Sequence, residues 1–174
     1  MLPSAYHQLV QALDQLPAIG PKAADRLAQH ILNHGQAQLL WQALEKAHND
    51  IQRCTQCQSY SSTELCPVCA NPQRQQHKVL VLATVNHQVQ AEEKGWQGTY
   101  FILHGLLSPM VGVGPSQLAI NKLHQRLLTP TIDQLVIALE DNAEGRATSQ
   151  YIQSLPELTS LNIEDISWKN WIAH

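Results

Sequence analysis

All four cysteines of the chain lie in two Cys-x-x-Cys pairs, Cys54 with Cys57 and Cys66 with Cys69, with eight residues between the pairs. Two such pairs can place four thiolates around one tetrahedral ion at ~2.3 Å, and a shell of four cysteines leaves no coordination position for a substrate. The spacing therefore predicts a structural Zn²⁺ site; two disulfides and a rubredoxin-like iron centre are the alternatives. A short, loop-rich segment of this kind lacks enough core to fold without its metal.

The composition indicates a folded chain that carries few charges. It has 174 residues, of which 44% are hydrophobic and 14% charged, and a formal net charge of −3. An apolar fraction near the globular average supports a sizeable core and argues against disorder. The chain contains no run of ~18 apolar residues, and its start lacks the order of a signal peptide. We therefore expect a cytoplasmic protein, in a reducing compartment where clustered cysteines bind metal rather than form disulfides.

The two halves of the chain differ in charge. Residues 1–78 hold six basic and five acidic side chains, a balance of +1, whereas residues 79–174 hold five basic and nine acidic side chains, a balance of −4. Bulk positive charge therefore does not attract a partner to the chain as a whole. Any contact with a polyanion is expected in the first half.

Three amphipathic helices are predicted before the cysteines, over residues 6–16, 21–33 and 37–53, because apolar residues recur there at helical spacing. Pro17 ends the first pattern. Pro21 suits the first position of the second helix, where its missing N–H is not needed. The chain therefore begins with a helical hairpin that leads into a third helix.

The segment Leu16-Pro-Ala-Ile-Gly20-Pro-Lys22-Ala-Ala-Asp-Arg26 is similar to a helix-hairpin-helix. In that motif a tight turn presents backbone N–H groups and a helix N-terminus to a DNA phosphate without reading the base sequence. Lys22 and Arg26 are four residues apart and share one helix face, so they can bracket a nucleic-acid backbone. Ala18 stands where the usual turn has a glycine, so a positive φ there costs more. An ordinary helical hairpin with solvated charges is the alternative.

The second half alternates predicted strands with predicted helices. Strands are predicted over residues 78–83, 100–103 and 134–139, and helices over 89–94, 116–128 and 145–155. A continuous apolar run such as the first strand is typical of a parallel sheet that is buried on both faces. The alternation predicts a βαβ organisation with a parallel sheet.

Three acidic side chains, Glu140, Asp141 and Glu144, follow the third predicted strand. Carboxylates at the carboxyl end of a parallel strand lie where α/β sheets bind ligands, so a magnesium site is one hypothesis. Two-metal phosphoryl transfer needs carboxylates from several strands, and the first strand ends at Ala83 and Thr84 without one. A solvated acidic loop that caps the next helix is the alternative.

Four motifs occur together in one order along the chain. They are the hairpin Leu-Pro-x-x-Gly-Pro-Lys-x-Ala-x-Arg-Leu-Ala, the four-cysteine knuckle followed by Ala-Asn-Pro-Gln-Arg, the loop Leu-Ser-Pro-Met-Val-Gly-Val-Gly-Pro at 107–115, and Ala-Glu-Gly-Arg-Ala-Thr at 143–148. In this combination the chain resembles the RecR family of bacterial recombination mediators over almost its whole length. The resemblance implies an α+β protein of three parts: a helix-hairpin-helix domain (1–53), a four-cysteine zinc finger (54–77) and a Toprim-like α/β domain with a parallel sheet (78–174).

The resemblance also implies a function. RecR proteins are non-catalytic; they form ring-like oligomers that clamp DNA and help RecO and RecF partners to load RecA. For this chain the resemblance implies a homo-oligomer, a dimer or a tetramer, in the cytoplasm and associated with the nucleoid. A metal-dependent Toprim nuclease or phosphotransferase using the acidic residues is one alternative, and an adaptor that has lost DNA binding is another.

The family roles transfer to particular residues. Gly20, Lys22 and Arg26 match the DNA-binding hairpin, and the four cysteines match the zinc ligands. Glu144 matches the acidic residue of the Toprim Glu-Gly pair, and with Glu140 and Asp141 it forms a possible acidic or partner-binding site.

The chain departs from the family pattern at the acidic positions. Ala83 and Val111 stand where the family has glutamate and aspartate, and Arg146 follows the Glu-Gly pair where an acid is usual. The sequence also stops at Ile-Ala-His, where family members continue through a Gly-Gly-Glu-Leu-Glu segment. We therefore expect either a divergent member that is shortened at its C-terminal end or a member from which this tail has been removed.

Overall fold

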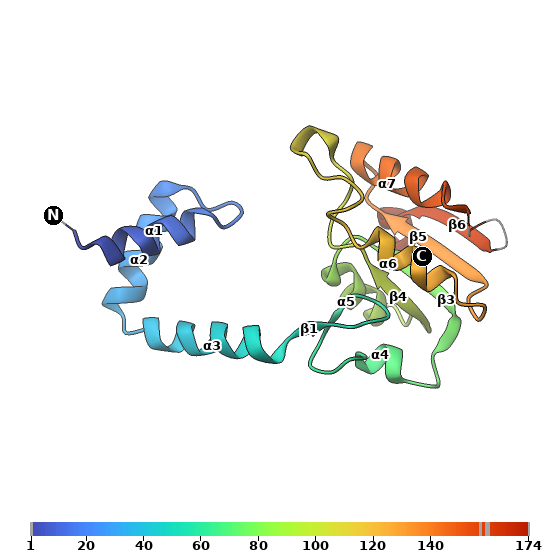
Figure 1. Cartoon of the computed structure of the whole chain (residues 1–174), viewed down its shortest axis with the longest axis horizontal. Helices are drawn as coiled ribbons and strands as arrows, with labels where there is room; N and C mark the ends of the chain where they lie inside the picture. Colours follow the sequence, from blue (N-terminus) through green and yellow to red (C-terminus); the bar gives the residue numbers. More distant parts are fainter. Residues whose placement is uncertain (1, 157, 159–160, 174) are drawn as a thin grey trace. The chain divides into compact units, whose positions relative to one another are not determined.

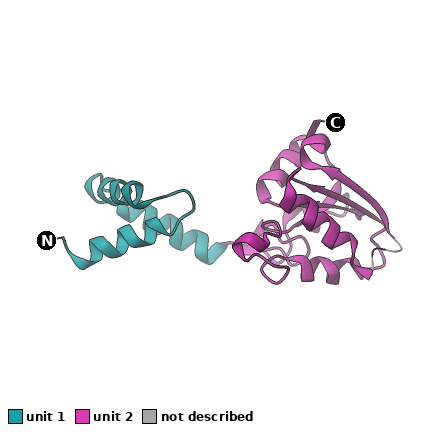
Figure 2. Cartoon of the chain, turned by 90° about the horizontal axis from the view of Figure 1, so that it is seen from above, with its two compact units in different colours: residues 1–50 teal, residues 51–174 magenta. Residues whose placement is uncertain are grey.

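The computed structural model describes residues 2–156, 158 and 161–173, and it divides into two compact units, residues 1–50 and residues 51–174 (Figure 2). Each unit has its own packing and is described by itself. No helix among the described residues is long and apolar enough to cross a membrane.

The first unit consists of three helices, α1 (Ser4–Asp14), α2 (Pro21–Asn33) and α3 (Ala37–Asp50). Pro21 occupies the first turn of α2, as expected. Helices α1 and α2 pack as a hairpin, and the Tyr6 hydroxyl donates a 2.6 Å hydrogen bond to the Asp25 carboxylate across it. The third helix ends at Asp50 rather than at residue 53, because the chain continues into a short strand at the zinc-finger segment.

The second unit begins with the cysteine-bearing segment, which we call the zinc finger (residues 51–71). It contains the two-residue strands β1 (Gln52–Arg53) and β2 (Tyr60–Ser61), paired antiparallel, and the short helix α4 (Pro67–Ala70). A parallel sheet follows, with strands β3 (Gln75–Leu82), β4 (Gly98–Ile102), β5 (Gln134–Leu139) and β6 (Asn162–Ser167) in the order β4-β3-β5-β6. The predicted α+β fold with a parallel sheet is therefore confirmed.

Helices cover both faces of this sheet (Figure 1). Helices α6 (Ile120–Leu127) and α7 (Ala143–Gln153) pack against one face, where Val79, Phe101 and Ile137 are fully buried. Helices α5 (Val85–Glu93) and α8 (Trp168–Ala173) pack against the other. A single-turn helix, η1 (Pro109–Val111), lies in the loop that the glycines and prolines predict.

Helices α1 and α7 begin two residues before their predicted starts, and α5 and α6 begin four residues from theirs. Helix α5 starts at Val85 rather than at 89, because the Thr84 hydroxyl caps it by accepting from the His87 N–H. Helix α6 starts at Ile120 rather than at 116, because the Gln117 side chain accepts from the Gly114 N–H and holds the preceding residues in a turn.

Strand β6 and helix α8 were not expected from the sequence. Strand β6 is an edge strand in which all six residues are exposed or half-buried, so it lacks a continuous apolar run. Helix α8 has only six residues, too few for a helical repeat to be recognised.

Candidate functional site

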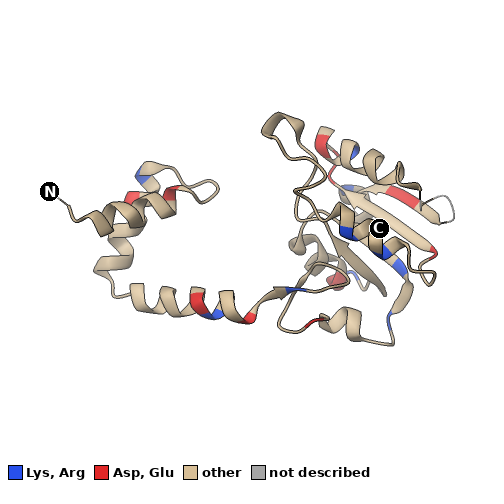
Figure 3. Cartoon of the chain, viewed as in Figure 1, with Lys and Arg blue, Asp and Glu red and all other residues tan. Residues whose placement is uncertain are grey.

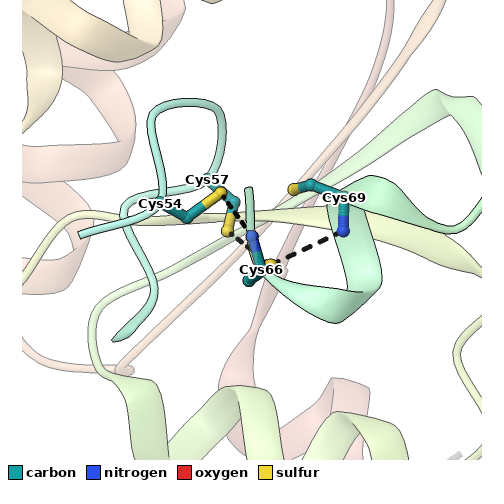
Figure 4. A group of neighbouring side chains, drawn as sticks. All are labelled: Cys54, Cys57, Cys66 and Cys69. Carbon is teal, nitrogen blue, oxygen red and sulfur yellow. Dashed lines mark hydrogen bonds between the residues drawn. The ribbon is translucent and has the colours of Figure 1, made fainter. Parts of the chain in front are cut away.

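The four cysteine side chains converge in the zinc finger (Figure 4). Their sulfur atoms lie within 4.8 Å of one another, and all four residues are buried. Four thiolates at this spacing fit a tetrahedral Zn²⁺ site, and four cysteine ligands leave no position for substrate. Among the described residues they are the only group of three or more His, Cys, Asp or Glu side chains whose ligand atoms lie so close together. The cluster therefore fits the structural zinc that the spacing predicts.

The surrounding atoms favour the thiolate form of one cysteine, Cys66, whereas the neighbouring thiols and burial raise the pKa of Cys57. The Cys66 N–H lies 3.3 Å from the Cys54 sulfur, and the Cys69 N–H lies 3.5 Å from the Cys66 sulfur. Hydrogen bonds from the neighbouring thiols of Cys57 and Cys69 lower the pKa of Cys66 to about 2. Because metals bind the thiolate form, this cysteine is prepared for a cation.

The zinc finger also contacts the edge of the parallel sheet. Cys57 contributes its carbonyl oxygen, which accepts a 2.8 Å hydrogen bond from the Ile102 N–H on the edge strand β4. Gln58 follows with a positive φ of 63°, and its side-chain amide donates to the Cys54 carbonyl at 3.0 Å. An uncovered edge strand is a template for unwanted pairing, so the finger protects β4 while the metal holds the finger in shape.

The hairpin between α1 and α2 has the turn that its motif requires. Ala18 adopts a positive φ of 63°, so the left-handed position does fall on alanine, where the usual motif has glycine. Gly20 precedes α2, and a Cβ at this position would meet no atom within 4 Å. The glycine therefore leaves open space at the start of the helix, rather than relieving a clash within the chain.

The N-terminus of α2 is free to bind an anion. No side chain caps it, and its first turn carries no acidic residue. Lys22 and Arg26 are both exposed on this helix, and no carboxylate in the described part of the chain forms an ion pair with either of them. An uncapped helix N-terminus next to two free cations is an arrangement that attracts phosphate.

The acidic residues lie at the carboxyl edge of the sheet, but they do not form a compact set of ligands. Asp141 is paired with Arg146 at 2.8 Å. Glu140, directly after β5, faces His87 at 3.9 Å, and one of its carboxylate oxygens is buried with no hydrogen-bond partner among the residues that the structure describes. Glu144 lies in the first turn of α7. Glu140 and Asp141, but not Glu144, line a small cavity of about 170 Å³ that also involves residues of β6.

His87 is the residue that sequence reasoning missed at this edge. Its ring stacks on Trp168 at 4.4 Å, and burial lowers its pKa even though the nearby Glu140 carboxylate acts in the opposite direction. The imidazole is therefore neutral near pH 7. The N-cap at Thr84 was the available signal, because it predicts a helix start that places His87 beside the end of β3.

The packing of α7 against the end of β5 explains why a glycine follows Glu144. An added Cβ at Gly145 would lie 1.9 Å from the backbone oxygen of Glu140, so α7 approaches the end of β5 too closely for any side chain. We expect Gly145→Ala to lower the free energy of unfolding of the second unit by about 1–3 kcal/mol through this overlap. Denaturant unfolding followed by tryptophan fluorescence measures the change, with the exposed Arg146→Ala as control, expected within about 0.5 kcal/mol of the parent chain. Equal stability of the two variants would contradict the close approach.

Family models match the three parts of the chain separately. A model described as "RecR, helix-hairpin-helix" matches residues 6–48, a model for the RecR zinc-finger domain with four cysteines matches residues 51–71, and a Toprim domain model matches residues 77–167.

Curated bacterial relatives match over most of the chain. "Recombination protein RecR" of Alcanivorax borkumensis is 36% identical over 163 residues, which are 92% of this chain and 82% of the relative. The protein of the same name from Coxiella burnetii is 38% identical over 164 residues, with the same coverage of both chains. That from Hydrogenovibrio crunogenus is 40% identical over 152 residues, 86% of this chain and 77% of the relative.

Proposed function

The chain belongs to the RecR family of recombination proteins, and from this membership we propose that it is a non-catalytic DNA-binding subunit of a recombinational repair mediator. In this role it clamps DNA and works with RecO- and RecF-like partners to load RecA. In this proposal the helix-hairpin-helix domain contacts DNA, the zinc finger is structural, and the rest of the second unit is the Toprim-like domain.

One observation carries the proposal: the open N-terminus of α2 lies beside the exposed Lys22 and Arg26. Backbone N–H groups and two cations can bind successive phosphates without touching the bases. Gly20 supports this reading, because the absence of a side chain lets a phosphate approach the turn. The contacts are few, so binding by one subunit is weak and depends on salt.

A direct binding measurement tests the proposal. The full chain is titrated into two labelled duplexes of unrelated sequence, and fluorescence anisotropy is recorded. Because phosphate contacts carry no sequence information, the two dissociation constants should agree within about twofold. A strong preference for one sequence, or the absence of binding to both at low salt, would contradict the proposal.

The arrangement of the acidic residues supports a non-catalytic role over a nuclease. Strand β3 ends at Leu82 and is followed by Ala83, so it offers no carboxylate to a metal pair. Asp141 is already paired with Arg146, and Glu140 faces the ring of His87. Two-metal phosphoryl transfer relies on several free carboxylates from neighbouring strands. A partner-binding role for the acidic residues of this edge, Glu144 included, is therefore the better proposal.

The first unit supports assembly into a homo-oligomer. Only Ala24 and Ala28 are buried among its described residues, whereas Leu39, Trp41 and Leu44 on α3 are 71%, 61% and 58% exposed. Large apolar side chains concentrated on one helix mark a protein-binding surface. Their position beside the DNA-binding hairpin in one unit fits the dimer or tetramer expected for a clamp.

Light scattering tests this assembly. Trp41→Ser with Leu44→Ser should reduce the mass from that of an oligomer toward that of one chain, because the two substitutions remove large exposed apolar groups of α3. Gln42→Ser, which changes an exposed polar residue of the same helix, is the control and should leave the mass unchanged. A mass of one chain for the parent protein would contradict the proposal.

A further inference from the structure

A second positively charged surface lies wholly within the second unit, where α6 faces the zinc finger beside the edge strand β4. It is a cavity of about 430 Å³, which we call the finger–α6 groove, and three basic residues line it: Arg53 from the finger, and Lys122 and Arg126 from α6. The remaining lining residues are threonines and glutamines, and no acidic residue is among those described there. Basic residues on α6 can be followed in Figure 3.

The finger–α6 groove holds a large share of the basic residues of the second unit. Residues 51–174 contain eight basic and ten acidic side chains, yet three of the eight cations line this one cavity. In the described part of the chain, no carboxylate lies within ion-pair distance of Arg53, Lys122 or Arg126. The groove is therefore a local positive surface on a unit whose net charge is negative.

Neutral acceptors hold two of the cations in position. The Arg126 guanidinium donates to the carbonyls of Gln56 and Tyr100, both at 2.8 Å, and the Lys122 ammonium donates to the Gln58 side chain at 3.0 Å. These bonds orient the charges but do not neutralise them. Because Arg126 is partly buried, an anion in the groove would recover electrostatic energy that desolvation has removed.

Arg126 makes several structural hydrogen bonds and Lys122 makes one, yet Lys122 and Arg53 both remain exposed. Arg126 ties the finger to β4, as its bonds to Gln56 and Tyr100 show. Arg53 and Lys122 are exposed at the rim of the groove. Two exposed cations beside a partly buried one can bind successive phosphates of a phosphodiester backbone.

An exposed aromatic ring adjoins the groove. Tyr60 on β2 is the direct cross-strand partner of Arg53 on β1, so the two side chains lie on the same face of the ladder. The tyrosine is 57% exposed, and its ring centre lies 5.8 Å from that of His104. Aromatic rings beside a basic groove stack the unpaired bases of single strands, whereas duplex bases are not available for stacking.

We propose that the finger–α6 groove binds the backbone of single-stranded DNA, with phosphates at Arg53, Lys122 and Arg126 and a base stacked on Tyr60. This inference rests on the proposed function and deepens it: the hairpin holds duplex DNA, and the groove holds the single strand. The two surfaces belong to different units and use different residues, so they can be inactivated separately.

Anisotropy titrations of the full chain with labelled oligothymidine test the groove. Arg53→Gln with Lys122→Gln should weaken single-strand binding at least about tenfold and make its salt dependence shallower, while duplex binding changes less than about twofold. Lys169→Gln, which removes an exposed cation of α8 outside the groove, is the matched control and should bind like the parent chain. Tyr60→Leu should weaken oligothymidine binding at least about fivefold through lost stacking.

Zinc content and thermal unfolding are measured for each variant to establish that the finger remains folded. Because Arg53 is next to the metal ligand Cys54, Lys122→Gln alone is also tested, since it changes a residue of α6 and not of the finger. Unchanged oligothymidine binding by folded groove variants would overturn the groove while leaving the hairpin intact. Loss of duplex binding only in Lys22→Glu with Arg26→Glu, together with loss of oligothymidine binding in the groove variants, supports both surfaces. If that pair of changes leaves duplex binding intact while the groove variants lose the single strand, the hairpin proposal fails and the groove stands.

Discussion

Removing zinc from this protein, by a strong chelator or by Cys66→Ser, is expected to unfold the finger and to lower the melting temperature of the second unit sharply. A structural zinc site contributes about 10–16 kcal/mol of apparent binding free energy, as much as the whole stability of a typical domain, about 5–15 kcal/mol. The four cysteines are also part of the apolar cluster that contains Leu80 and Ile102. Loss of the metal therefore exposes the edge of β4 together with part of the sheet's core.

Circular dichroism during heating, with zinc content measured on the same samples, records this effect. The near-ultraviolet signal should also change, because the stacked rings of Trp168 and Trp171 belong to or pack against the same cluster. Adding zinc back to the chelated parent chain, but not to Cys66→Ser, should restore both signals. A zinc-free chain with the same melting temperature as the zinc-bound chain would show that the site is not structural.

Reversal of both hairpin charges, Lys22→Glu with Arg26→Glu, is expected to weaken duplex binding at least about 100-fold at low salt. Each substitution removes an attraction to phosphate and adds a repulsion next to the open N-terminus of α2. Both side chains are exposed, so the helix itself should remain intact. Anisotropy titration gives the affinity, and far-ultraviolet circular dichroism monitors the fold.

Lys46→Glu is the control for this reversal. Lys46 is an exposed cation on α3 in the same unit, so its reversal changes the net charge without touching the hairpin. It should lower the affinity by no more than about threefold, through the long-range field alone. An equal loss in the control and in the double variant would mean that total charge, and not the hairpin, sets the affinity.

The sequence was sufficient to predict the parts whose signals are local. The Cys-x-x-Cys spacing predicts the metal cluster, and the apolar run at 78–83 predicts the buried strand β3. Pro21 and the helical repeat predict α2 with the same first and last residues as in the structure. Ala18 has a positive φ in the structure, at the turn position where the sequence indicates that such a conformation costs more than with glycine.

The features that could not be predicted depend on contacts between distant residues. Strand β6 is stabilised by its pairing with β5 rather than by its own half-exposed residues. The stack of His87 on Trp168 joins two elements that lie far apart in the second unit's sequence. The finger–α6 groove is of the same kind, because Gln56 and Arg126 are 70 positions apart and meet only when the finger docks on β4.

The salt dependence of duplex binding tests the central claim most directly, because it counts the phosphate contacts that the hairpin makes. The logarithm of the association constant is plotted against the logarithm of salt concentration for the parent chain and for Lys22→Glu with Arg26→Glu. Each lost phosphate contact flattens such a plot by about 0.9, so the double variant should have a slope shallower by about 2. Parallel lines for the two proteins would contradict DNA binding through the hairpin.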